Sequence, residues 1–184
     1  MSTGEEHVRF AGRVQAERVS IEQGAAGLVQ GGQADLHYAG AVAIVSSDSI
    51  AVRQGGSQWM IAAENLSVDF GGAAAMAAGN DLQVTRGGAA AMAAGRDMHV
   101  TMGGASWMLA GGEMHVQNGG GAILVGGKTR LESGLVGLSI AGKTEIAPGA
   151  TVLFTTKQAL AFGAGLVLAA TLLRPGKRRK RAKN

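Results

Sequence analysis

The chain has 184 residues, of which 46% are apolar, 16% charged and 4% aromatic, with 31 glycines and no cysteine. The lack of cysteine excludes disulfides, zinc–thiolate sites, iron–sulfur clusters and cysteine nucleophiles, and the apolar content argues against a disordered glycine-rich chain. The net charge of +4 is uneven, because residues 174–184 carry seven of the 17 cations and no anion, which leaves 10 cations against 13 anions elsewhere.

The first residues read MSTGEEHVRF and contain no apolar run of the kind found in a secretory signal. We interpret residues 1–13 as an N-terminal segment that caps the repeats that follow.

From Ala39 onward the sequence repeats every 16 residues without gaps, as in GGAAAMAAGNDLQVTR followed by GGAAAMAAGRDMHVTM. Three columns of mostly large aliphatic residues stay in phase, and they are Leu28, Ile44, Met60, Met76, Met92, Met108, Leu124 and Ile140; Ala34, Ile50, Leu66, Leu82, Met98 and Met114; and Leu36, Val52, Val68, Val84, Val100 and Val116. A fixed period of this length indicates a solenoid, in which each repeat buries its apolar side chains against the next.

Each block contains two short runs, and the run 81–85 (DLQVT) alternates polar and apolar residues as a half-buried strand does. Glycines such as Gly71-Gly72 and Gly79 separate the runs, and glycine adopts positive φ at tight corners without a Cβ penalty. We therefore predict an all-β fold, a single-stranded β-solenoid (β-helix) of about eight ~16-residue coils over residues 14–150, with ~4.8 Å between coils.

The phase of the repeat shifts in two places. After Gly119, Thr129 and Leu131 fall one residue early and Ile146 restores the phase, which we interpret as a β-bulge. The first coil, with Val19 and Ile21, is also one residue out of phase, as is common for terminal coils that cap a stack.

The first run of each block is apolar on both faces of the predicted strand. The outward sets are Ala41, Ala43 and Val45; Ser57, Trp59 and Ile61; Ala73, Ala75 and Ala77; Ala89, Ala91 and Ala93; Ala105, Trp107 and Leu109; and Gly121, Ile123 and Val125. Strands apolar on both faces are normally buried on both, and a patch several coils tall exceeds what monomers usually expose. We predict a contact face formed mainly by Trp59, Ile61, Ala75, Ala91, Trp107, Leu109 and Ile123.

Residues 159–173 form an uncharged apolar run, ALAFGAGLVLAATLL, which extends back to Val152 if Lys157 and Gln158 are included. A membrane span needs ~20 apolar residues, and Ala161, Gly165 and Ala169 form a small-residue stripe suited to helix contact in lipid. We predict a membrane-anchor helix over residues 152–173. The alternative is a buried helix that caps the solenoid.

The basic tail over residues 174–184 suits anionic lipid headgroups, at ~1 kcal/mol for each cation near the surface. The predicted headgroup contacts are Arg174, Lys177, Arg178, Arg179, Lys180 and Arg181. Nucleic acid is the less favoured partner, because the tail has no aromatic residue for base stacking. Basic segments stay cytoplasmic. A spanning helix would then place residues 1–150 outside, with no signal peptide to translocate them, whereas a shallow or re-entrant anchor keeps both ends cytoplasmic and fits the short apolar run. We therefore expect a membrane-associated chain with a cytoplasmic solenoid, and an extracytoplasmic solenoid is the alternative.

No residue pattern predicts catalysis. His99 and His115 share a column without a fixed acidic third ligand, and Asp81, Asp97 and Glu113 stack at a corner with a spacing that differs from calcium-binding glycine-rich repeats. We interpret the histidines as surface residues and the carboxylates as turn caps. Walker, Gly-x-Ser-x-Gly and His-Glu-x-x-His motifs do not occur. We therefore predict no catalytic, cofactor or metal site and no enzymatic activity.

The coil columns and glycine corners over roughly residues 14–150 resemble those of bactofilins, small bacterial β-solenoid proteins that polymerise without nucleotide and associate with membranes. The resemblance implies a cytoskeletal scaffold that assembles end to end, although bactofilins attach through the N-terminus and the anchor predicted here is C-terminal. We expect a structural protein that associates with itself or with another membrane-associated protein. The alternative is a surface-displayed binding module or adhesin that uses the flat face.

Overall fold

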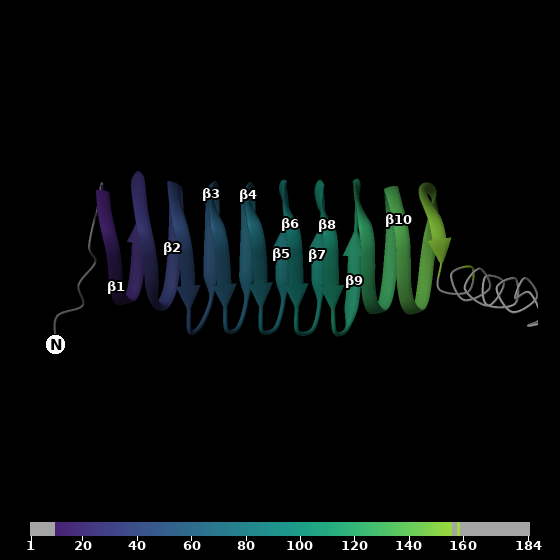
Figure 1. Cartoon of the computed structure of the whole chain (residues 1–184), viewed down its shortest axis with the longest axis horizontal. Helices are drawn as coiled ribbons and strands as arrows, with labels where there is room; N and C mark the ends of the chain where they lie inside the picture. Colours follow the sequence, from purple (N-terminus) through teal and green to yellow (C-terminus); the bar gives the residue numbers. More distant parts are fainter. Residues whose placement is uncertain (1–9, 156–157, 159–184) are drawn as a thin grey trace, which may run out of the picture.

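The computed structural model describes residues 10–155 and residue 158, and it shows an all-β rod in which one parallel sheet is wound into a β-solenoid (Figure 1). The strands are β1 (Phe10–Ile21), β2 (Gly24–Ser46), β3 (Ile50–Ala62), β4 (Leu66–Ala78), β5 (Leu82–Val84), β6 (Gly87–Ala94), β7 (Met98–Val100), β8 (Gly103–Ala110), β9 (Glu113–Val116) and β10 (Gly119–Thr155). The long strand β4 pairs with both β5 and β6, and the long strand β10 pairs with both β8 and β9. The sheet therefore closes on itself between β4 and β10.

The predicted 16-residue coil is confirmed in the middle of the stack, where Met60 pairs with Met76 and Met76 with Met92. Toward both ends the coil is one residue shorter, because Val19 pairs with Ala34 and Thr129 pairs with Met114. The shorter step continues past Thr129, since a Cβ on Gly134 would meet the carbonyl oxygen of Gly119 and one on Gly137 that of Ala122, each 15 residues earlier. The phase shift after Gly119 is therefore a change of coil length and not the β-bulge that the sequence pattern predicts.

Three columns of buried side chains fill the interior. They are Val14, Val29, Ile44, Met60, Met76, Met92, Met108, Leu124 and Ser139; Val19, Ala34, Ile50, Leu66, Leu82, Met98, Met114 and Thr129; and Ile21, Leu36, Val52, Val68, Val84, Val100, Val116 and Leu131. Leu28 and Ile140, which the repeat predicted for the first column, lie outside it. The shorter steps move Val29 and Ser139 into those places, and Ile140 is 41% exposed.

Glycine pairs allow the coils to stack closely at one corner. A Cβ on Gly71 would overlap the carbonyl oxygen of Gly55 in the preceding coil, and a Cβ on Gly72 would lie 2.7 Å from the carbonyl oxygen of Gly88 in the following coil. The corner thus directs these positions along the stacking axis, where coils are only ~4.8 Å apart. Glycine is required here mainly because any side chain would meet the neighbouring backbone.

The positive φ predicted for corner glycines is present at Gly87 and Gly134, but at other coils it falls on the residue that precedes the corner. Tyr38, Gln54, Phe70 and Asn118 have φ between 52° and 76°. Successive members of this set are separated in the sequence by one full coil or by a whole number of coils. At these corners one residue, such as Phe70, makes the left-handed turn, and the next residue, such as Gly71, allows the close approach of the coils.

The described structure begins and ends in strands. β1 begins at Phe10, inside the segment predicted to be a cap, and β10 includes residues 152–155, which the sequence had assigned to the start of the anchor helix. Gln158 apart, the rest of that segment and the basic tail lie outside the described residues. Among the described residues, no helix has the length and apolar character needed to cross a membrane.

Thr129 offers a test of the column assignment. Its side chain is fully buried in the column of Met114, and its Oγ1 has no hydrogen-bond partner among residues 10–155. Replacing it with the isosteric valine removes a hydroxyl that water no longer solvates, and we expect T129V to raise the free energy of unfolding by about 1 kcal/mol in urea unfolding followed by circular dichroism.

Ser46 provides the matched control for this substitution. It is also buried, but its Oγ accepts a hydrogen bond from the Asp48 amide and lies within hydrogen-bond distance of the Ser49 carbonyl oxygen. S46A should therefore destabilise the protein by about 1 kcal/mol. A destabilising T129V would show that the hydroxyl of Thr129 has a partner that this column does not provide.

Candidate functional site: an apolar contact face

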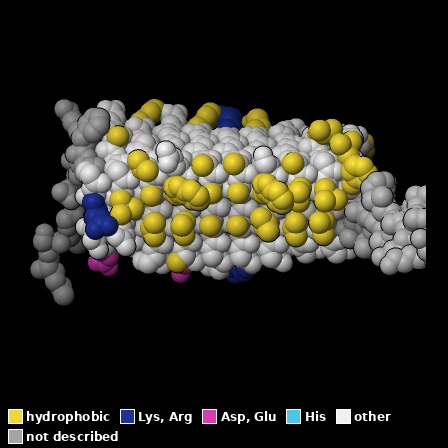
Figure 2. All heavy atoms as spheres, in the orientation of Figure 1, with side chains coloured by type: hydrophobic (Ala, Val, Ile, Leu, Met, Phe, Trp, Pro, Cys, Tyr) yellow, Lys and Arg dark blue, Asp and Glu magenta, His cyan; other side chains and the backbone are white. Residues whose placement is uncertain are grey.

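Three outward columns lie side by side on one side of the rod. They are Val42, Gln58, Ala74, Ala90, Ser106 and Ala122; Ala43, Trp59, Ala75, Ala91, Trp107 and Ile123; and Val45, Ile61, Ala77, Ala93, Leu109 and Val125. Figure 2 shows apolar side chains in parallel rows along the long axis of the body. We call these three columns the Ala/Trp face.

The large residues of the Ala/Trp face are exposed although they are apolar. Trp59 and Trp107 are 53% and 54% exposed, and Ile61 and Leu109 are 47% and 45% exposed. Ala75, Ala91 and Ile123 are half-buried between their neighbours. All seven predicted contact residues therefore lie on one surface, with the two tryptophans separated by two alanine coils.

The first member of each predicted outward set does not belong to this face. Ala41, Ala73 and Ala89 pack against the core and Ala105 is buried, whereas Val42 is 52% exposed. The strand ladder passes from the Ala41–Ser57 pair directly to the Ala43–Trp59 pair. The chain bends at the skipped position, so two successive residues point outward and the simple alternation fails there.

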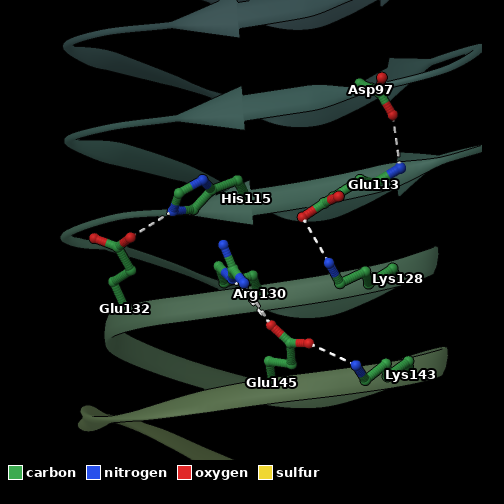
Figure 3. A network of polar contacts seen from close by, with 8 residues as sticks. All are labelled: Asp97, Glu113, His115, Lys128, Arg130, Glu132, Lys143 and Glu145. Atoms are coloured by element: carbon green, nitrogen blue, oxygen red, sulfur yellow. Dashed lines mark hydrogen bonds and ion pairs between the residues drawn. The ribbon is translucent and has the colours of Figure 1, made fainter.

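The polar side of the rod is tied together by ion pairs between successive coils (Figure 3). His115 Nε2 lies 2.8 Å from Glu132 Oε1, and Lys128 Nζ lies 3.3 Å from Glu113 Oε1. These side chains therefore pair with one another, which is the arrangement of a structural surface.

The corner carboxylates act as caps between coils, as the sequence predicted. Asp97 Oδ1 accepts a hydrogen bond from the backbone N–H of Glu113 at 2.7 Å, and Asp81 Oδ1 accepts one from the backbone N–H of Asp97 at 3.4 Å. Asn65 Oδ1 begins the series by accepting from the N–H of Asp81 at 3.3 Å. Each side chain thus serves a corner amide in the next coil.

The two stacked histidines are neighbours, as their shared column predicted. The ring centroids of His99 and His115 are 4.4 Å apart in an edge-to-face arrangement, and His115 also contacts Glu132. Among the described residues, no three His, Cys, Asp or Glu side chains are grouped so that they could hold a metal ion.

Glu145 carries the largest shift of pKa on this side. Hydrogen bonds from Lys143 and then from Arg130 to its carboxylate lower its pKa to about 2. Because this folded pKa lies below the ordinary value of 4.5, the ion pairs stabilise the fold fully above about pH 4.5, and their contribution is lost as the pH falls toward 2.

We expect E145Q to remove this part of the acid sensitivity. The stability difference between the native chain and E145Q, measured by urea unfolding between pH 6 and 2, should narrow as the pH falls. E64Q, at an exposed corner where the described residues show no ion pair, is the control. A difference that is constant with pH would mean that Glu145 acts through packing alone.

Sequence reasoning missed an exposed column at the glycine corner. Tyr38, Phe70 and Met102 are 56%, 43% and 42% exposed and recur every second coil, and the Arg86 guanidinium lies over the Phe70 ring at 4.3 Å. Their recurrence is visible in the sequence. The position lies between the predicted strands, however, so the alternation of strand residues does not predict whether its side chain points inward or outward.

Comparisons with protein-family models, with characterised proteins and with solved structures found no match to this chain. The parallel β-solenoid is shown by the structure, whereas membership of the bactofilins has no support beyond the likeness of architecture.

Proposed function

We propose that this chain is a non-enzymatic scaffold, anchored to a membrane, that associates with itself through the Ala/Trp face. One observation carries the proposal: the rod has ion pairs between successive coils on one side and a broad, mainly apolar surface on the other. Trp59 and Trp107 are about half exposed on it, and exposed apolar surfaces several coils tall indicate an interaction site.

The membrane part of the proposal rests on the sequence. The uncharged residues 159–173 directly precede the cationic residues 174–184. An apolar segment followed by a basic cluster provides two membrane signals, insertion and attraction to anionic headgroups. Attachment would also raise the local concentration of the chains, which strengthens an otherwise weak contact between them.

The molar mass of the full chain in detergent, measured by light scattering, tests self-association. We expect a dimer or larger oligomer whose mass falls on dilution. A monomer at every concentration would contradict self-association. It would favour the second candidate, a binding module that uses the same face for a different protein, because the exposed tryptophans would then lack a partner.

A further inference from the structure

We infer that a second copy of this chain binds the Ala/Trp face antiparallel, around a two-fold axis at the coil of Ala75. The inference rests on the self-association proposed above and adds its geometry. In this arrangement Trp59 lies against Ala91 of the second copy and Trp107 lies against Ala43 of the second copy.

The sizes of the side chains along the face carry the argument. In the central column the order by coil is Ala43, Trp59, Ala75, Ala91, Trp107 and Ile123, so each tryptophan is a protrusion and the coils between them are shallow. Packed sheets interdigitate, with large side chains of one facing small side chains of the other. A stable pair of faces must therefore place each tryptophan opposite alanine.

A closed pair of faces has its two-fold axis in the plane of contact. For two rods that lie side by side without crossing, this axis runs either along the rod or across it. With the axis along the rod, each coil faces the same coil of the second copy. Trp59 then meets the large residues of its own coil, Gln58, Trp59 and Ile61, while the Ala75 and Ala91 coils face alanine across a gap. This parallel orientation combines collisions with voids, both of which destabilise packing.

With the axis across the rod, the order of coils in the second copy is reversed. An axis through the Ala75 coil brings the Trp59 coil opposite the Ala91 coil, one step on either side of the axis. It brings the Trp107 coil opposite the Ala43 coil, two steps on either side. Ile61 likewise faces Ala93 of the second copy, because the columns of the two copies stay aligned across the contact.

Other positions of the axis do not place both tryptophans on alanine. An axis half a coil later sets Trp59 opposite Trp107, and one coil later, through Ala91, it sets Trp59 opposite Ile123. Half a coil earlier, Trp107 meets Leu28, and one coil earlier Trp59 meets itself. The Ala75 coil is therefore the one centre of this face at which both protrusions fit.

The same register brings the indoles of the two copies together. Trp59 of one copy and Trp107 of the other occupy adjacent levels, ~4.8 Å apart along the rod, which is a favourable separation for stacked aromatic rings. In this register seven coils face one another, because the Ile123 coil at one end of the face lies opposite the Leu28 coil of the second copy. With a width of ~13 Å they give about 450 Å² per copy before the protrusion of the side chains is added. Both sides together reach about 900 Å², just under the ~1,000 Å² that a specific contact usually clears, so the indole anchors carry much of the affinity.

Cysteine cross-linking of the full chain in detergent tests this geometry, and the absence of natural cysteines makes single variants unambiguous. The three positions Val42, Ala74 and Ser106 lie in one exposed column. A short bis-maleimide should cross-link A74C to itself, and it should cross-link V42C to S106C when the two variants, carrying different tags, are mixed. Neither V42C nor S106C alone should react, because equivalent residues are then four coils, ~19 Å, apart along the rod.

The outcomes separate the geometry from the proposed function. If V42C alone cross-links as well as A74C, the copies are parallel, and the inference is wrong although self-association stands. If V42C pairs with A122C in place of S106C, the register has moved half a coil and the assigned axis is wrong. If A74C does not cross-link and light scattering gives a monomer, the proposed self-association fails together with the geometry.

Discussion

Alanine at Gly103 is expected to lower the free energy of unfolding by about 3 kcal/mol, the upper end of the range for overpacked sites. Its Cβ would overlap the carbonyl oxygen of Gly87, a backbone atom of the preceding coil that no rotamer change can move. Relief requires the coils to separate, and that would lengthen the ladder hydrogen bonds between β6 and β8. Urea unfolding of the full chain, followed by far-UV circular dichroism, measures the loss.

Gly126 provides a control with the same substitution and a different environment. A Cβ there would have its nearest contacts at 3.5 Å and 3.6 Å, with Thr129 Oγ1 and the Ala110 carbonyl oxygen. Alanine already occupies the equivalent position one coil earlier, at Ala110. G126A should therefore leave the stability unchanged or raise it by about 0.5 kcal/mol. Equal effects of G103A and G126A would show that the glycine corner is not sterically closed.

The fold could be predicted from the sequence because burial imposes its period on the side chains. The columns of Met76, Leu82 and Val84 recur once per coil through the middle of the chain, and the structure buries them all. The ends could not be predicted in the same way. Leu28 and Val29 are adjacent aliphatic residues, so the sequence fits either coil length, and the ladder of β1 and β2 decides it.

The position of Ser139 shows why local hydrophobicity misleads at the C-terminal end. Ile140 suits a core and continues the predicted column, yet the shorter step buries Ser139 and leaves Ile140 exposed. The step is set by the pairing of a whole coil, as between Lys128–Leu131 and Glu113–Val116. A single favourable side chain cannot override it.

The candidate face was largely predictable, since an apolar strand surface without a covering element is visible in the sequence. The sequence did not predict that Ser106 is exposed and its neighbour Ala105 buried, because both side chains are small and the bend lies between them. The ion pairs were also missed. Arg130 and Glu145 are 15 residues apart, as are Arg96 and Asp81 in the 16-residue part of the stack, and the 16-residue columns align neither pair.

The antiparallel pair has a consequence for membrane attachment. The described chain ends at Thr155 near one end of the rod (Figure 1). In a pair centred on the Ala75 coil, the two carboxyl ends leave from opposite ends, ten coils or about 48 Å apart. If both C-terminal segments enter one membrane, the paired rods lie along its surface.

Glutamate at both Trp59 and Trp107 is expected to convert the self-associated chain into a monomer. Each tryptophan anchor at the centre of a contact is worth about 2 kcal/mol, or about 30-fold in Kd. The introduced carboxylates would also have to lose water against alanine without a partner of opposite charge. Both positions are about half exposed in the single chain, so the solenoid itself should keep its circular dichroism spectrum and its urea midpoint. Light scattering of the full chain in detergent measures the change in mass.

Q83E is the control for added charge, because Gln83 is exposed on the opposite side of the same part of the rod, between Ser67 and His99. A contact on the Ala/Trp face and one on the polar side would respond differently to these variants. If the Ala/Trp face alone joins the copies, Q83E should leave the molar mass unchanged. An oligomer that survives W59E/W107E but is lost in Q83E would place the contact on the polar side. Dissociation by the tryptophan variant alone would instead assign the contact to the Ala/Trp face.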